Sequence, residues 1–91
     1  MHFEWDENKR RSNLRRHGID FADLEEVFEG LTLTLLDGRF DYGEERFFTL
    51  GLLKDRVVAI SHTETDDTVR IVSARKALKD EEINYFKEVR D

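Results

Sequence analysis

The spacing of hydrophobic residues along this 91-residue chain changes twice, from a helical period to a strand period and back again. A short extended entry at residues 2–5 leads to Asp6, whose carboxylate is suited to cap a helix. The pattern then predicts a helix over about Glu7–His17, ended by Gly18. This first helix carries few apolar residues and many basic ones.

Two more helices are predicted from apolar residues that recur every three or four positions. The second helix begins near Asp20, which can cap it, and ends at Gly30. Its core-facing residues are Phe21, Leu24, Val27 and Phe28. The third helix begins at about Leu78 and closes the chain. Its core-facing residues are Ile83, Phe86 and Val89.

Between residues 31 and 75 the hydrophobic period changes to two, which is typical of half-buried strands. Strands are predicted over about 31–35, 45–53, 56–63 and 68–75, separated by a turn at Asp37-Gly38 and by polar connections at 54–55 and 64–67. Connections this short join antiparallel neighbours. The predicted fold class is α+β, a single domain over residues 1–91 with two N-terminal helices, a four-stranded antiparallel sheet and a C-terminal helix. One face of that sheet is expected to stay open.

Composition narrows the classes of protein and site. The chain has no Cys, which excludes a disulfide scaffold, a Cys-ligated zinc and a thiol nucleophile. No apolar stretch approaches the ~20 residues that a membrane span requires, and the N-terminal residues do not match a secretory signal, so we expect a cytoplasmic protein. Carboxylates and histidines do not cluster at metal-ligand spacing, so we expect neither a metal ion nor another cofactor.

Basic residues are concentrated in two segments although the chain is acidic, with a formal net charge of −6. Between residues 20 and 45, nine acidic side chains stand against one basic one. The basic residues of the two segments are Lys9, Arg10, Arg11, Arg15, Arg16, Arg70, Arg75, Lys76 and Lys79. If folding brings the segments together, they form a positive surface able to bind phosphates. The alternative is that these charges merely solvate exposed faces.

Lys9, Asn13 and His17 recur every four residues and therefore form one stripe on the first predicted helix. Histidine titrates near neutral pH, which suits proton transfer. The alternative is structural, with Asn13 capping a neighbouring loop and His17 donating to the last carbonyls of the helix. We expect His62, on a predicted strand, to be packed against its neighbours and His2 to be exposed to solvent.

Three sequence blocks extend over most of the chain. They are Phe3-Glu4-Trp5-Asp6-Glu7 with Lys9, Asn13, His17-Gly18-Ile19 and Phe21 at fixed offsets, then Tyr42-Gly43-Glu44-Glu45-Arg46-Phe47, then Arg70-Ile71-Val72-Ser73-Ala74-Arg75-Lys76-Ala77. In these blocks the chain resembles the BrnT branch of the RelE-like toxins of bacterial type II toxin-antitoxin pairs. One departure is the last helix, which is commonly more basic in the family and here carries Asp80-Glu81-Glu82.

The resemblance implies a RelE-like fold and a ribonuclease that inhibits translation and growth until an antitoxin covers it. The implied partner is a BrnA-like antitoxin with a ribbon-helix-helix dimer, which holds two toxins and binds operator DNA itself. The alternative function is a non-catalytic module that binds nucleic acid or a protein as a subunit of a regulatory complex. Turnover of RNA separates the two.

A ribonuclease that uses no metal needs a base, an acid and cations for the phosphate, and arginine is the best such cation because its planar donors bind bidentately. We expect proton transfer from His17, with Glu45 as the base or as a group that orients an arginine. The expected phosphate ligands are Arg46, Arg70, Arg75 and Lys76, and the remaining RNA-binding residues are Lys9, Asn13, Arg16 and Ser73. Strand alternation directs Arg70 and Arg75 to opposite faces unless the strand ends at Ala74. We expect it to end there, with Arg75 and Lys76 in the connection to the last helix, where a flexible side chain can turn toward either face.

Overall fold

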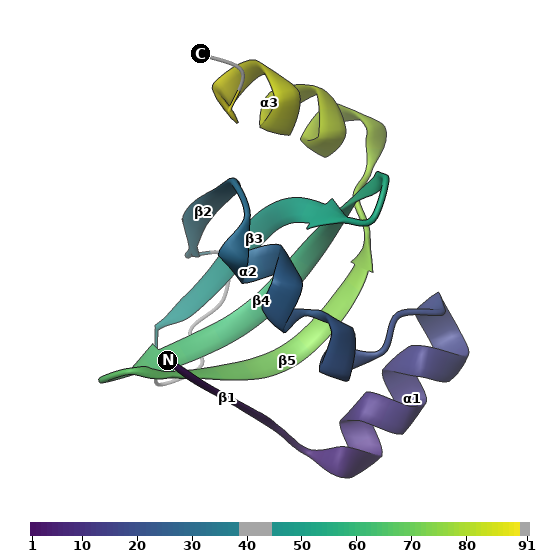
Figure 1. Ribbon diagram of the computed structural model, residues 1–91, viewed down its shortest axis with the longest axis vertical. Helices are drawn as coiled ribbons and strands as arrows, with labels where there is room; N and C mark the ends of the chain where they lie inside the picture. The colour runs from purple at the N-terminus through teal and green to yellow at the C-terminus, as the bar shows by residue number, and fades with distance from the viewer. Residues whose placement is uncertain (39–44, 90–91) are drawn as a thin grey trace.

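The computed structural model describes residues 1–38 and 45–89. Its elements are β1 (His2–Trp5), α1 (Glu7–His17), a 3₁₀ turn η1 (Phe21–Asp23), α2 (Glu25–Glu29), β2 (Thr32–Asp37), β3 (Arg46–Leu53), β4 (Arg56–Thr65), β5 (Thr68–Lys76) and α3 (Lys79–Val89). The described strands form one mixed sheet in the order β1-β5-β4-β3-β2, as Figure 1 shows. The predicted α+β class is confirmed. The predicted turn begins at Asp37, the last residue of β2, and the connection after Gly38 lies outside the described residues.

The first predicted helix is confirmed at both ends. The Asp6 carboxylate accepts from the backbone N–H groups of Asn8 and Lys9, at 2.8 and 3.4 Å, and so caps α1. Gly18 ends the helix with φ at 71°, a left-handed conformation that costs little without a Cβ. Local sequence chemistry therefore sets both ends of α1.

The second predicted helix is divided into two parts. Asp20 caps as expected, accepting from the Ala22 N–H at 3.0 Å, but it caps η1. The Leu24 N–H donates to the Phe21 carbonyl at 3.1 Å, and regular α-helix begins only at Glu25. A 3₁₀ turn has three residues per turn and therefore aligns residues three apart, which buries Phe21 and Leu24 together.

The predicted four-stranded antiparallel sheet is wrong in one respect, because the N-terminal entry forms a fifth strand. β1 pairs in parallel with β5, with His2 opposite Thr68 and Trp5 opposite Ile71. The apolar side of β1 joins the core, where the ring centroids of Phe3 and Phe28 lie 5.3 Å apart. The sequence shows that residues 2–5 are extended, but the partner strand lies more than 60 residues away along the chain.

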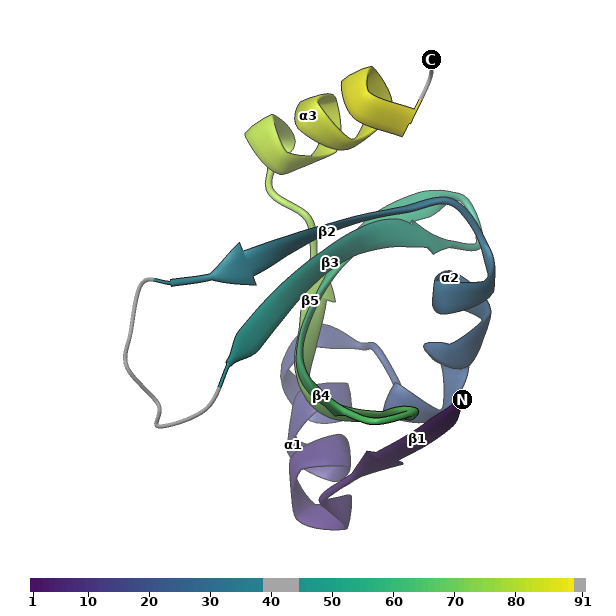
Figure 2. The same cartoon turned by 90° about the vertical axis from the view of Figure 1, so that its left-hand side faces the viewer.

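The sheet is strongly curved and carries a hydrophobic cluster on each face (Figure 2). The larger cluster joins the sheet to η1 and α2, which lie inside the curve. Its buried residues are Ile19, Phe21, Leu24, Val27, Leu53, Val58, Ile60, Val69, Ile71 and Ala74. The smaller cluster lies under α3 on the opposite face. Its buried residues are Leu50, Val57, Ala59, Ala77 and Tyr85.

The core-facing side of α3 was predicted wrongly. Ile83 and Phe86 are 58% and 43% exposed, whereas Tyr85 is 1% exposed. The Tyr85 hydroxyl donates to the backbone carbonyl of Leu31 at 2.8 Å, and this bond sets the rotation of the helix. Val89 packs against the smaller cluster as expected.

A β-bulge in β5 changes which of its side chains share a face. Ser61 of β4 pairs with Ser73, and the next residue, His62, pairs with Ile71, so Val72 is left without a partner in the register. The alternation of β5 therefore reverses at this point. Arg70 and Arg75 therefore share the face opposite the larger cluster. The expectation that the last strand ends at Ala74 is wrong, because β5 continues to Lys76 and the bulge, not a flexible connection, places Arg75 on this face.

Candidate functional site

The face of the sheet opposite the larger cluster is covered by α3 at one end, and beyond it none of the other described elements packs over this face (Figure 2). Four side chains lie in register across this open face, one from each of four adjacent strands. They are Leu35, Phe48, Ser61 and Ser73, here called the central row. Its side chains are half-buried or exposed. The central row is therefore a shallow floor made of two serines, one aromatic ring and one leucine.

Arginines flank the central row on both sides. Arg75 precedes α3 and lies opposite Ala59, in the neighbouring row toward the helix. Arg46 lies opposite Asp37, and Arg70 opposite Thr63, in the neighbouring row away from the helix. Residues two apart on a strand face the same way, so all three arginines border the open face. A phosphate over the central row would lie between guanidinium groups from both sides.

The Arg75 guanidinium is held by several groups at once. Its Nη1 and Nη2 donate to the two carboxylate oxygens of Glu81 at 2.8 and 3.0 Å, and its Cζ lies 5.5 Å from the centroid of the Phe48 ring. Glu81 also accepts from the Leu78 N–H at 2.8 Å at the start of α3. Sequence reasoning missed Glu81, although an acidic residue three positions after a helix start is a known capping signal.

The Arg70 guanidinium donates to the Glu4 carboxylate at 2.7 Å, and about half of each side chain is exposed. Exposed pairs of this kind contribute about 0–1 kcal/mol. Arg70 is thus held by a weak contact that a phosphate can replace.

A hollow of about 210 Å³ lies between α1 and the part of β5 beyond Ile71, which is not paired with β1. Its lining residues are Lys9, Ser12, Asn13, Arg16, His17, Val72 and Ser73. Ser73 belongs to the central row as well, so the hollow continues the open face. Lys9 and Arg16 make no ion pair within the described residues, and both are exposed. The two basic segments are therefore neighbours in the fold, although the Lys and Arg side chains that line the hollow, Lys9 and Arg16, both come from α1.

A family model described as the ribonuclease toxin BrnT of type II toxin-antitoxin systems matches residues 5–81. The chain belongs to the BrnT family. Its substrate class is therefore RNA, and its partner is an antitoxin. No curated protein matches the chain significantly. The resemblance found in the sequence blocks is confirmed, and with it the expectation of a ribonuclease toxin.

In this BrnT-family chain Asn13 joins α1 to β5 beside the hollow. Its side chain is 6% exposed, its Nδ2 donates to the Ile19 carbonyl and its Oδ1 accepts from the Ala74 N–H, both at 3.1 Å. These bonds fasten α1 to the edge of β5. Both ends of the Asn13 amide thus make buried bonds, as the structural alternative describes, while Asn13 also lines the hollow, so its RNA-binding role stays a prediction.

Two other expected site residues lie away from the central row. Lys76 lies opposite Val58, a residue of the larger cluster, and so belongs to the other face of the sheet. Glu45 is exposed and directly precedes Arg46, so alternation directs it to the opposite face or the rim, as predicted. The structure brings neither side chain into the central row.

One basic residue of α1, Arg10, forms hydrogen bonds with nearby carboxylates and does not line the hollow. Arg10 donates to Glu7 at 2.7 and 2.8 Å and to Asp20 at 3.1 and 3.2 Å. The hydrogen bond from Arg10 lowers the pKa of Glu7 to about 2. Arg10 thus ties α1 to η1, while Lys9 and Arg16 line the hollow.

The remaining histidines lie where the sequence predicted. His62 is fully buried, and His2 has a side chain that is 78% exposed. Within the described part of the chain, His, Asp and Glu side chains do not gather in groups of three or more that could hold a metal ion. None of the described helices is long and apolar enough to cross a membrane.

Proposed function

We propose that this BrnT-family chain is a metal-independent endoribonuclease that binds single-stranded RNA along the central row. The observation that carries the proposal is the arrangement of Arg75 on one side of the row and Arg46 and Arg70 on the other. Guanidinium groups placed on both sides of a phosphate can stabilise the negative charge that develops when it reacts. His17 lines the hollow at the Ser73 end of the row.

In the proposed reaction the ribose 2′-oxygen attacks the adjacent phosphorus atom, and the bond from phosphorus to the 5′-oxygen breaks. A base removes the 2′-hydroxyl proton, and an acid protonates the departing 5′-oxygen. The products carry a 2′,3′-cyclic phosphate and a 5′-hydroxyl. We assign one proton transfer to His17. Glu45, which directly precedes Arg46 at the start of β3, either acts as the base from the rim of the sheet or orients an arginine.

Lys9, Arg16 and Ser73 are proposed to bind the RNA backbone beyond the reacting phosphate. Lys9 and Arg16 supply charge from α1, and the Ser73 hydroxyl can donate to a phosphate oxygen. Lys76 is left with a peripheral role, since it lies on the other face of the sheet.

We further infer that the fold is RelE-like and that the antitoxin is BrnA-like. A ribbon-helix-helix dimer holding two toxins would bind operator DNA through its own strands, since this acidic chain adds no DNA affinity. The arginine-flanked face is a suitable target for an acidic segment of such an antitoxin. Replacing Arg16 with Ala should make this association weaker and less dependent on salt, as measured by titration at two ionic strengths.

The activity is tested with purified protein, end-labelled RNA and EDTA. Cleavage to fragments that end in 2′,3′-cyclic phosphate is expected, and His17→Gln should lower the rate about 10²- to 10⁴-fold while RNA affinity persists. His2→Gln is the matched control, because His2 is exposed and belongs neither to the central row nor to the lining of the hollow. Intact RNA that is nevertheless bound would contradict the enzyme and favour the non-catalytic binding module.

A further inference from the structure

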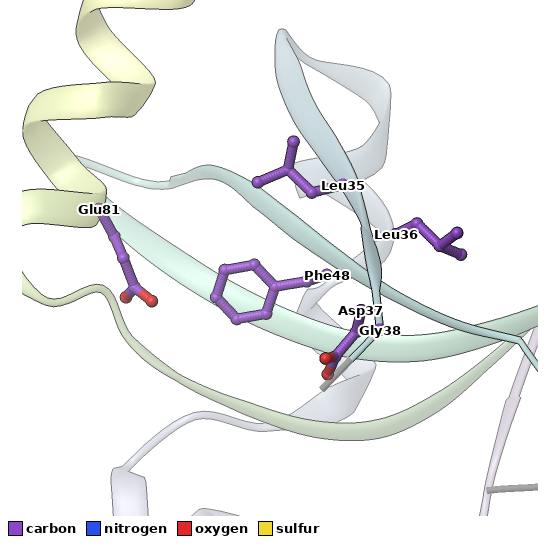
Figure 3. A pocket seen from close by; sticks show the side chains of 6 residues that line it. All are labelled: Leu35, Leu36, Asp37, Gly38, Phe48 and Glu81. Atoms are coloured by element: carbon purple, nitrogen blue, oxygen red, sulfur yellow. The ribbon is translucent and has the colours of Figure 1, made fainter. Parts of the chain in front are cut away.

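A pocket of about 240 Å³ lies at the β2 end of the central row, away from the hollow beside α1 (Figure 3). Its lining residues are Leu35, Leu36, Asp37, Gly38, Phe48 and Glu81. Leu35 and Phe48 are themselves members of the central row, so the pocket and the hollow are joined by Ser61 and Ser73. Three strand spacings of ~4.8 Å separate Leu35 from Ser73, a span of ~14 Å.

The pocket differs in chemistry from the rest of the proposed RNA-binding surface. Its described lining holds an aromatic ring, two leucines and two carboxylates, and no cation. Figure 3 shows the carboxylates of Glu81 and Asp37 on opposite sides of the Phe48 ring. Such a lining suits a flat, uncharged ring with N–H donors on its edge and does not suit a phosphate.

The phosphate ligand Arg75 is directly beside this pocket. Its guanidinium contacts both Glu81 and Phe48, which line the pocket. A nucleotide whose phosphate is held by Arg75 would therefore have its base within reach of the Phe48 ring. Bases of single-stranded RNA stack on aromatic rings and expose their Watson-Crick edges to side chains.

We propose that this pocket is a nucleobase subsite that prefers guanine, a proposal that rests on the proposed RNA binding. Guanine has two adjacent N–H donors on its Watson-Crick edge, N1–H and the N2 amino group, and a carboxylate can accept both at once. A carboxylate offers about four acceptor positions, and Glu81 already accepts three bonds from Arg75 and Leu78, so it can accept about one more. We therefore assign the paired guanine donors to Asp37. Phe48 supplies the stacking surface.

The test measures binding apart from cleavage. Fluorescence anisotropy measures the affinity of the chain for four labelled 2′-O-methyl RNA pentamers. The pentamers consist of uracil except at the central position, which carries each of the four bases in turn. The 2′-O-methyl groups block attack on the phosphate. The guanine pentamer should bind on the order of tenfold more tightly than the others, which is the discrimination expected from one bidentate contact.

Two variants assign the preference to the pocket. Phe48→Leu and Asp37→Asn should each bring the four affinities to within about twofold of one another. The matched controls are Phe86→Leu and Asp80→Asn, which change exposed residues of α3 outside the pocket lining and should keep the preference. Circular dichroism confirms that each variant is folded.

Equal binding of the four pentamers, preference for another base, or a preference that the pocket variants leave unchanged would each overturn the subsite. Loss of antitoxin capture in the pocket variants with unchanged base preference would also overturn it, because the pocket would then belong to the protein partner. Cleavage of unmodified RNA is measured in parallel. Cleavage without base preference refutes the subsite alone, and base preference without cleavage refutes the enzyme alone.

Discussion

Acid should destabilise this protein through one buried histidine. The His62 side chain is fully buried, its Nε2 lies 2.7 Å from the Thr49 hydroxyl, and its ring packs between Phe28 and Phe47. Burial lowers the pKa of His62 to about 4, whereas histidine in an unfolded chain titrates near 6.5. The Glu64 carboxylate, 3.6 Å from Nδ1, is the nearest acidic group recorded for a protonated His62.

The sign and size of the effect follow from the two pKa values. Between about pH 4 and pH 6.5 the unfolded chain binds a proton that the folded protein does not, so the free energy of unfolding rises with pH. The contribution of His62 is complete above about pH 6.5 and is lost as the pH falls toward 4. A difference of about 2.5 pH units corresponds to about 3 kcal/mol, a large share of the ~5–15 kcal/mol typical of small domains.

The assay is urea unfolding followed by circular dichroism at about pH 5 and about pH 7.5. The wild-type chain should lose about 2 kcal/mol at the lower pH, since that interval covers about 1.5 pH units of the His62 window. His62→Gln keeps a group that can bond to Thr49 but does not titrate, so it should lose far less. His2→Gln should behave as the wild type because His2 is exposed. The lowered pKa of Glu7, about 2, places its own titration below this range.

Equal pH dependence in the wild type and His62→Gln would refute the reasoning. An NMR titration supplies an independent measurement, because the ring protons of His62 should keep the chemical shifts of the neutral form down to about pH 4. Titration of these protons near pH 6.5 in the folded protein would show that burial does not hold His62 neutral.

Three further substitutions test the scaffold and the site. Arg70→Ala should change the free energy of unfolding by less than about 1 kcal/mol, since its pair with Glu4 is exposed, and should slow RNA cleavage about 10²- to 10³-fold; unfolding at room temperature would instead make it structural. Asn13→Ala should cost about 2–4 kcal/mol in urea unfolding, because it leaves two buried backbone groups without partners. Gly51→Ala should cost about 1–3 kcal/mol, because the new Cβ would lie 2.5 Å from Val27 Cγ1; an unchanged midpoint would show that Val27 moves freely.

The sequence alone was enough for the elements whose signals are local. Asp6 and Gly18 define the ends of α1 through bonds to residues at most four positions away. The strands β3, β4 and β5 follow from alternation and short connections. The charge clusters marked the segments that become α1 and β5, but only the fold shows that these segments are neighbours. Lys9, Arg16, His17 and Ser73 do line one hollow. The membership of the BrnT family could likewise be predicted from the spaced sequence blocks.

Tertiary structure decided what depends on pairing between distant residues. The bulge at Val72 comes from the register with β4, and it places Arg70 and Arg75 on one face against the simple alternation. The Tyr85 hydroxyl sets the rotation of α3 by donating to the Leu31 carbonyl. The Asn13 side chain is held in place by the Ala74 N–H, which donates to its amide oxygen. The spacing of hydrophobic residues shows only which side chains lie on the same side of one helix or strand. Which of those side chains reaches the site is set by hydrogen bonds and packing between segments, whose free energy depends on partners far away in the chain.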